Sequence, residues 1–572
     1  MVLFTQCYLV LPIASLFIGL NGTADAQEEK KTSPNVTIVQ ASADDFLTRL
    51  EYITLLAGNL GKEQWDNVKG TLESFLDGID RKKPIRIDIL LDGQDVRYRP
   101  SFPIANLGNF IRNLKGFGIN AKKVGGALYR LSGDFKGFMR VANGYATIAE
   151  HKTDVPAKLE NPTTALAPLL EKKYDFALDV QNTEAGQKAR HTAVQEIHKE
   201  IFTGLKAKTG ERKSRFATRK LFLELLMDEA DRFYAEASQL TVGLTTDPKE
   251  KESRLELHLA ALDDTDLDNA IQVLGIKPSY FANIKRSDNA ILAGRINHPF
   301  DKMRKDHLVK LFSALQIYAQ ELIEEDANQK EDEKDGEKKI VDQFFDMLAA
   351  GAKSGELDCF FEVRQKDGKR TLIGGIKAPN GNGLFNIVQL VPKARPGIKV
   401  KLSVDKESEV SIHSVSIPSK FQATFQDVFS GEPVVYFGTG EDAVWCAVGE
   451  SALDELKSAI KKFGMPNDGI PDPVLVELYM KPGPLVELLD QRRKRQEKTN
   501  GDKKLTGKKK DARRETADLR KLEIVAFKPG DDTITLTLKR IDSHIEGGIR
   551  FGEDILRLLG NRIAKFSEEN LE

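Results

Sequence analysis

The sequence has few of the residues and spacings that build a compact reactive site. Its 572 residues include 3 cysteines, 2 tryptophans and 8 histidines. It contains no C-x-x-C, H-E-x-x-H, G-x-S-x-G or G-x-x-x-x-G-K-[ST] motif, so the local signatures of zinc sites, serine hydrolases and phosphate loops are missing. We therefore predict no cofactor, no metal ligands and no catalytic residues, and an enzyme would need a dispersed site.

Neither sign of charge is in excess. Lys and Arg number 85 against 86 Asp and Glu, a net charge of −1. A nucleic-acid-binding protein shows a basic excess, so no nucleic-acid partner is expected. Hydrophobic residues at 40% and charged residues at 30% allow packed cores and exclude general disorder. After residue 26 there is no run of 18 apolar residues, so no membrane span is expected there.

The long uncharged stretch lies at the N-terminus. Residues 2–20 carry no charged side chain, and Ala24-Asp25-Ala26 follows them. An apolar run before a small-x-small tripeptide is typical of a secretory signal peptide. We therefore expect residues 1–26 to be cleaved and the rest to be exported to the periplasm or the cell exterior. The alternative is an uncleaved N-terminal anchor, because no Lys or Arg precedes the run; membrane contact is expected only in that case.

Two cysteines remain once Cys7 is removed with the signal peptide. Cys359 and Cys446 both lie in strand-like apolar sequence, and an oxidising compartment would allow them to form a disulfide. The alternative is a pair of buried reduced thiols that pack as small hydrophobic groups.

A unit of two alternating strands, a polar turn and an amphipathic helix recurs along the chain. In residues 254–259 the leucines face one way, the period of a half-buried strand. The pattern predicts an α+β fold with antiparallel sheets built from repeated β-hairpin–helix units, helices packed on one face and two or three domains. The expected strand pairs are 240–248 with 254–259, 357–363 with 370–376, 434–437 with 443–448, 522–527 with 533–538, 127–131 with 137–141, and 85–89 with 95–99.

Composition also indicates domain boundaries. We expect an N-terminal α+β domain over 27–155, a central α+β domain with long helices over 170–323, and a C-terminal α+β domain over 340–572. The intervening stretches 152–173 and 324–337 are predicted to be linkers or exposed loops, being rich in proline and in acidic residues respectively. The basic stretch 491–514 is predicted to be a mobile loop.

Four local patterns resemble functional sites, and each has a simpler structural explanation. Asp264, Asp266 and Asp268 alternate as calcium ligands do, but an EF-hand needs Gly and Glu where Asn269 and Gly275 stand, so helix capping is preferred. His191 and His198 are interpreted as surface histidines, and Gly438 and Gly440 as parts of a hairpin turn. Ser411 and His413 are interpreted as ordinary surface residues.

Three stretches carry a resemblance: SQLTVGL at 238–244, LELHLA at 255–260 and DNAILA at 288–293. With the signal peptide they resemble a group of uncharacterised exported proteins common in planctomycete bacteria. The resemblance implies export and an α+β fold, and it brings no activity, cofactor or site.

Three classes of function remain. We favour a non-catalytic structural or interaction protein of the bacterial envelope, which would show an exposed apolar patch or sheet edge. A periplasmic carrier of an apolar ligand or lipid would instead show an apolar cavity, and an enzyme a cleft with perturbed titratable groups. The partner would be an envelope protein or an anionic surface contacting the basic loop.

Overall fold

The computed structural model describes residues 36–92, 95–327, 329–379, 381–429, 431–463, 471–500, 523–527 and 531–570. The predicted signal peptide lies outside these residues. Among them, no helix is both long enough and apolar enough to cross a membrane.

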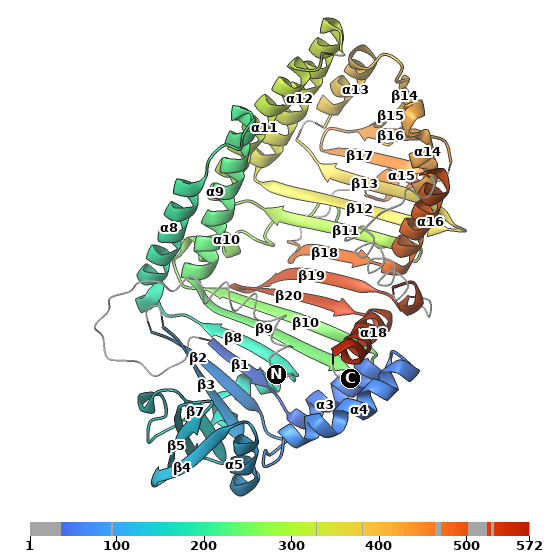
Figure 1. The fold of residues 1–572 in the computed structure, drawn as a ribbon. Coiled ribbons are helices and arrows are strands. Elements are labelled where there is room, and N and C mark those ends of the chain that lie inside the picture. The colour runs from blue at the N-terminus through green and yellow to red at the C-terminus, as the bar shows by residue number, and fades with distance from the viewer. Residues whose placement is uncertain are drawn as a thin grey trace.

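One antiparallel sheet runs through the entire described chain (Figure 1). The α+β class with an antiparallel sheet, predicted from the alternating strand pattern, is confirmed. The pairings place the strands in a single open series. From one edge to the other they are β4 (Ile119–Gly125), β5 (Leu128–Gly133), β6 (Gly137–Ala142), β7 (Tyr145–Ala149), β3 (Asp95–Pro103), β2 (Ile85–Asp92), β1 (Val36–Gln40), β8 (Phe176–Gln181), β9 (Ala237–Asp247), β10 (Glu252–Ala261), β20 (His544–Phe551), β19 (Ile534–Ile541), β18 (Val474–Met480), β11 (Ala290–Pro299), β12 (Glu356–Lys366), β13 (Lys369–Lys377), β17 (Ala443–Gly449), β16 (Val434–Thr439), β15 (Val410–Ser416) and β14 (Val400–Glu407).

The sheet has a seam between β10 and β20. Every described strand from β1 to β10 lies on one side of this pairing, and every described strand from β11 to β20 lies on the other. The seam pairs residues 253–260 of β10 with 544–551 of β20. Strands of all three predicted domains therefore share one sheet, since β8 pairs with β1 and the C-terminal strands β18–β20 lie between β10 and β11.

The long helices lie along the ends of the strands. In Figure 1, α8, α9, α11 and α12 follow one end of the strands, whereas α3, α4, α16 and α18 follow the other. The helices are α3 (Ala43–Leu55), α4 (Asn59–Phe75), α5 (Leu107–Gly116), η2 (Lys152–Asp154), α6 (Pro162–Ala165), α7 (Ala167–Glu171), η3 (Glu184–Gly186), α8 (Gln187–Gly204), α9 (Lys213–Glu236), α10 (Asp266–Gln272), α11 (Lys302–Glu324), α12 (Glu331–Ser354), α13 (Gly383–Ala394), α14 (Ser419–Val428), α15 (Ala452–Phe463), α16 (Pro482–Asn500) and α18 (Glu553–Asn570).

Local sequence signals account for most of these elements. Ser42 caps α3, since its side chain accepts a hydrogen bond of 3.0 Å from the Asp45 amide. The predicted hairpins β2–β3, β5–β6, β9–β10, β12–β13 and β16–β17 are all formed. One hairpin prediction is wrong: residues 523–526 are helical, and β19 instead pairs with β20 across the short turn at Asp542.

The predicted linkers are also part of the folded structure. Segment 152–173 contains η2, α6 and α7, and its Leu166 is buried with Val39 and Tyr174. In the acidic stretch 324–337, residue 324 ends α11 and residues 331–337 form the first turns of α12, where the Lys334 ammonium donates a hydrogen bond of 2.9 Å to the Glu324 carbonyl oxygen. The basic stretch 491–514 continues helix α16 to Asn500, and residues 501–514 lie outside the described residues.

The densest core lies beneath α15. Trp445 of β17 contacts the rings of Phe281 and Phe360 at centroid distances of 5.4 and 5.8 Å. Leu456 and Ile460 of α15 complete this cluster, and both are fully buried. The spacing of four residues puts Leu456 and Ile460 on one side of α15, the side that packs against β13, β16 and β17.

Candidate functional sites

One face of the sheet is apolar across the seam. Two rows of directly paired residues cross eight strands, from β9 through β20 and β11 to β13, and we call this surface the apolar face. The first row is Val242, Leu257, Gly547, Leu538, Val476, Ile296, Cys359 and Ile376. The second row is Leu244, Leu255, Ile549, Leu536, Leu478, Gly294, Phe361 and Gly374.

The apolar face is not completely buried, although Val242 and Leu257 pack against the buried cluster that includes Leu240 and Leu259. Apart from the two buried glycines Gly294 and Gly374, the side chains of both rows keep part of their surface accessible to solvent. By contrast, Phe360 and Ile373 point to the opposite face and are buried in the core beneath α15. A sheet face of this extent is normally buried against another layer, so its incomplete burial makes it a candidate contact surface.

The long helices add further exposed apolar side chains. On α9, Phe222 is 51% exposed and Leu226 is 49% exposed, and their spacing places them on one side of the helix. Helix α11 has no buried residue, and its Ile317 is exposed. Ion pairs join these helices, such as the one between Arg232 Nη1 of α9 and Asp301 Oδ2, 2.9 Å apart, at the N-terminus of α11.

The opposite face carries a row of polar residues, which we call the polar row. Its directly paired members run across eight strands from β3 to β19. They are Arg99, Asp88, Thr37, Asp179, Thr241, His258, Glu546 and Lys539. Hydrogen bonds join neighbours, including Thr241 Oγ1 to Asp179 Oδ1 at 2.7 Å and Arg99 Nη2 to Asp88 Oδ2 at 2.9 Å.

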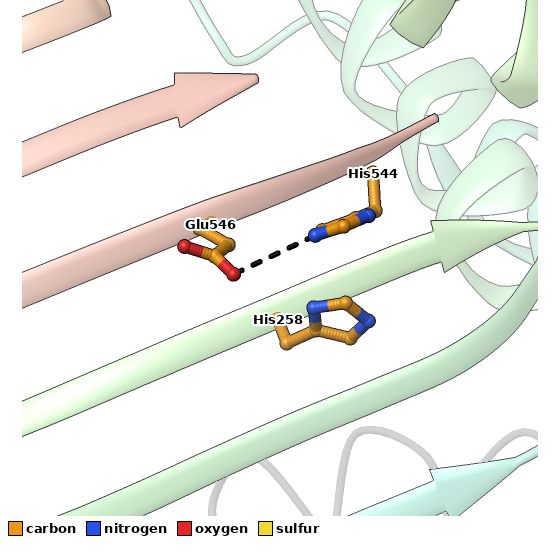
Figure 2. Close-up of side chains that lie close together, drawn as sticks. All are labelled: His258, His544 and Glu546. Carbon is orange, nitrogen blue, oxygen red and sulfur yellow. Dashed lines mark ion pairs between the residues drawn. The ribbon is translucent and has the colours of Figure 1, made fainter. Parts of the chain in front are cut away.

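Three side chains at the seam end of the polar row converge (Figure 2). His258 of β10 and His544 and Glu546 of β20 form what we call the His–Glu cluster, and one ligand atom from each lies within 4.8 Å of the others. The His544 Nε2 atom lies 3.5 Å from Glu546 Oε1, and the two imidazole centroids are 4.4 Å apart. Figure 2 shows the His258 ring beside both partners.

The electrostatics of the His–Glu cluster favour a neutral His258 and an ionised Glu546. Burial lowers the pKa of His258, and the neighbouring His544 and Lys172 lower it further. Burial raises the pKa of Glu546, but Lys539 and His544 outweigh it and leave the pKa below its ordinary value. The Nδ1 atom of His258 is buried without a hydrogen-bond partner among the described residues. Two imidazoles and a carboxylate are ligands that zinc accepts.

The structure does not contain the disulfide suggested by the sequence. Cys359 and Cys446 are free thiols. Strand β13 lies between them, with Ile376 paired to Cys359 and Gly374 paired to Cys446. Two strand spacings separate the backbones by about 10 Å, beyond the reach of a disulfide.

The other sequence candidates occupy structural positions. Asp266 and Asp268 lie in the first turn of α10, where their charge complements the helix N-terminus, but the residue that caps this helix is Thr265 and not an aspartate. Gly438 and Gly440 belong to the β16–β17 hairpin and its turn, as predicted. The interpretation of His413 as ordinary surface is wrong.

The imidazole of His413 is fully buried. It accepts a hydrogen bond of 3.0 Å from the Ser403 amide at Nδ1 and lies 3.0 Å from Thr439 Oγ1 at Nε2. His191 pairs with Asp231 at 2.9 Å, whereas His198 stacks on Phe202. The two helical histidines therefore have separate partners.

Sequence reasoning missed the His–Glu cluster because its two strands are far apart in the chain. His544 and Glu546 stand two residues apart on one strand, which brings both to one face, but a single such pair is common. Only the β10–β20 pairing adds His258. No family model, no curated protein and no solved structure matches the chain.

Proposed function

We propose that this chain is an exported, non-catalytic interaction protein of the bacterial envelope that binds an apolar partner on the apolar face of its sheet. The observation that carries the proposal is the continuity of half-buried apolar side chains over eight paired strands. Eight strands at about 4.8 Å spacing span about 34 Å, which is the scale of a specific protein interface. Export is supported by the apolar N-terminal segment and Ala24-Asp25-Ala26.

A second candidate function uses the same surface. A carrier would lay the hydrocarbon chain of a lipid across the strands, and the apolar side chains of β9–β13 provide such a surface without a charged residue in either row.

Native mass spectrometry of the full-length protein isolated from its own envelope tests both functions. A stoichiometric protein complex is the result expected from the interaction function. A lipid-sized mass released by denaturation would support the carrier instead. A bare monomer that also fails to bind envelope extracts or lipid vesicles would refute both.

Variants at the seam locate the surface. Leu257→Gln and Leu538→Gln place polar groups on the apolar face on either side of Gly547, and each should weaken partner binding by about tenfold or more. Thr537→Gln is the matched control because it lies on the same strand β19 but on the opposite face. Equal loss of binding in the control would exclude the apolar face as the docking surface.

A further inference from the structure

The seam is the β10–β20 pairing, through which the N-terminal and C-terminal groups of strands join into one sheet. Among the described strands, β10 and β20 alone join the group β1–β10 to the group β11–β20. Their ladder is supplemented by the ion pair between Lys251 and Glu553, 3.1 Å apart, and by the pair between Arg550 and Glu252. The His–Glu cluster lies at the opposite end of the ladder, where His544 pairs with Ala260.

The cluster provides one ligand atom from β10 and two from β20. All three atoms lie within 4.8 Å of one another, and tetrahedral zinc holds its ligand atoms about 3.3 Å apart. Small rotations about side-chain torsions close this difference, because His258 Nδ1 has no hydrogen-bond partner among the described residues to hold it elsewhere. A metal ion would give this buried ring nitrogen the partner that it lacks among the described residues.

The cluster carries one carboxylate, which would offset half of the charge of a divalent cation. Glu546 contributes one carboxylate, whose Oε2 atom lies 3.4 Å from the Lys539 ammonium while Oε1 faces His544. One oxygen is therefore directed to the cluster and the other to a neighbouring cation, the arrangement in which an outer group orients a metal ligand. Lys172 and Asp179 are the other charged groups that act on His258.

We propose that His258, His544 and Glu546 bind one divalent transition metal ion, with zinc as the best match, and that the ion cross-links β10 to β20. Two imidazole nitrogens and one carboxylate oxygen fit zinc better than calcium or magnesium, which prefer all-oxygen ligands. Water would fill the fourth position. Because the ligands come from both sides of the seam, the ion stabilises the junction between the two groups of strands.

Zinc titration of the chelator-treated full-length protein tests the site. Competition with a chromophoric chelator should show one zinc ion per chain. Zinc binding should weaken by more than about tenfold in each of the variants His258→Gln, His544→Gln and Glu546→Gln. A loss of about tenfold already results from replacing a residue that only hydrogen-bonds to a metal ligand, so the loss of a ligand should cost more. His151→Gln is the matched control, because His151 is exposed and distant in the chain, and it should bind zinc as the unmodified protein does.

Two further readouts keep the test independent of how well the variants fold. Cobalt(II) added to the unmodified protein should give the intense visible absorption of a four-coordinate site. Hydrogen exchange of the β10 and β20 amides should slow on zinc addition in the unmodified protein and the control variant only. The proposal is overturned if the unmodified chain binds no stoichiometric zinc, or if all three ligand variants bind it with unchanged affinity.

Discussion

Replacing Asp358 by Asn should make the protein more stable at neutral pH. Asp358 lies on β12 and is 1% exposed. Its carboxylate accepts hydrogen bonds from Ser279 Oγ at 2.9 Å and from the Tyr280 amide at 2.5 Å. These contacts fix the segment that places Phe281 against Trp445. The position is therefore structurally important, yet the charge on it is unfavourable.

The magnitude follows from the pKa. Burial raises the pKa of Asp358 from 3.8 to about 6, although both hydrogen bonds lower it. A difference of this size corresponds to about 3 kcal/mol between the two protonation states. The folded state binds the proton more tightly than the unfolded state, so the stabilising contribution is complete below about pH 4. It is lost as the pH rises to about 6, and the loss then levels off.

Asparagine keeps the shape and removes the charge, and it reverses the hydrogen bond with Ser279. Its Oδ1 atom can accept from the Tyr280 amide, and its Nδ2 atom can donate to Ser279 Oγ. That hydroxyl oxygen already accepts 3.1 Å from the Phe281 amide and has a second lone pair available. The variant should therefore gain up to about 3 kcal/mol over the parent at about pH 7.5 and almost nothing at about pH 4.

Urea unfolding followed by tryptophan fluorescence measures the effect. The chain has 2 tryptophans, so a Trp65→Phe background leaves Trp445 to report on the core beside Asp358. The midpoint difference between Asp358→Asn and its parent should grow from acid to neutral pH. Asp405→Asn is the control, and it should lower stability at neutral pH where Asp358→Asn raises it. The reason is that the hydrogen bond from Lys457 lowers the pKa of Asp405. A difference that stays constant with pH would refute the reasoning.

Three other changes test the packing, the polar row and the thiols. Leu456→Ala should lower the free energy of unfolding by about 2–5 kcal/mol in urea, whereas Leu489→Ala, at a 60% exposed position, should change it by less than about 0.5 kcal/mol. Asp88→Ala should cost about 3–5 kcal/mol, because it leaves the buried Arg99 without its 2.9 Å carboxylate partner; an unchanged midpoint would show that the row adds no stability. Burial raises the pKa of Cys359 to about 11. Iodoacetamide should therefore modify Cys359 and Cys446 slowly in the native protein and completely after unfolding without reductant. Protection of the two thiols in the unfolded chain would reveal a disulfide.

Much of the local structure is predictable because its signals are short-range. The alternating leucines of residues 254–259 and the polar turn before them place β9 and β10 in one hairpin. The Ser42 cap marks the start of α3 for the same reason. The wrong hairpin at 522–527 shows the limit of such signals: a proline and glycine between two apolar runs indicate a turn, but not which strands pair across it.

The order of the strands was not predictable. The sequence gives no sign that β20 returns to β10, or that β18 lies between β19 and β11, because both pairings join residues far apart in the chain. The His–Glu cluster depends entirely on the first of these pairings. The burial of His413 was missed for a related reason, since its partner Ser403 lies on β14 and its partner Thr439 on β16.

The two proposals concern opposite faces of one junction. Leu257 and His258 are neighbours on β10, so the first side chain lies on the apolar face and the second lies in the His–Glu cluster. A partner on the apolar face and a metal ion in the cluster would both contact β10 and β20, and both would favour the paired seam over an open one. If opening of the seam accompanies release of the partner, the two ligands must strengthen each other's binding by the same factor. Partner affinity measured with and without zinc therefore tests whether release of the partner opens the seam.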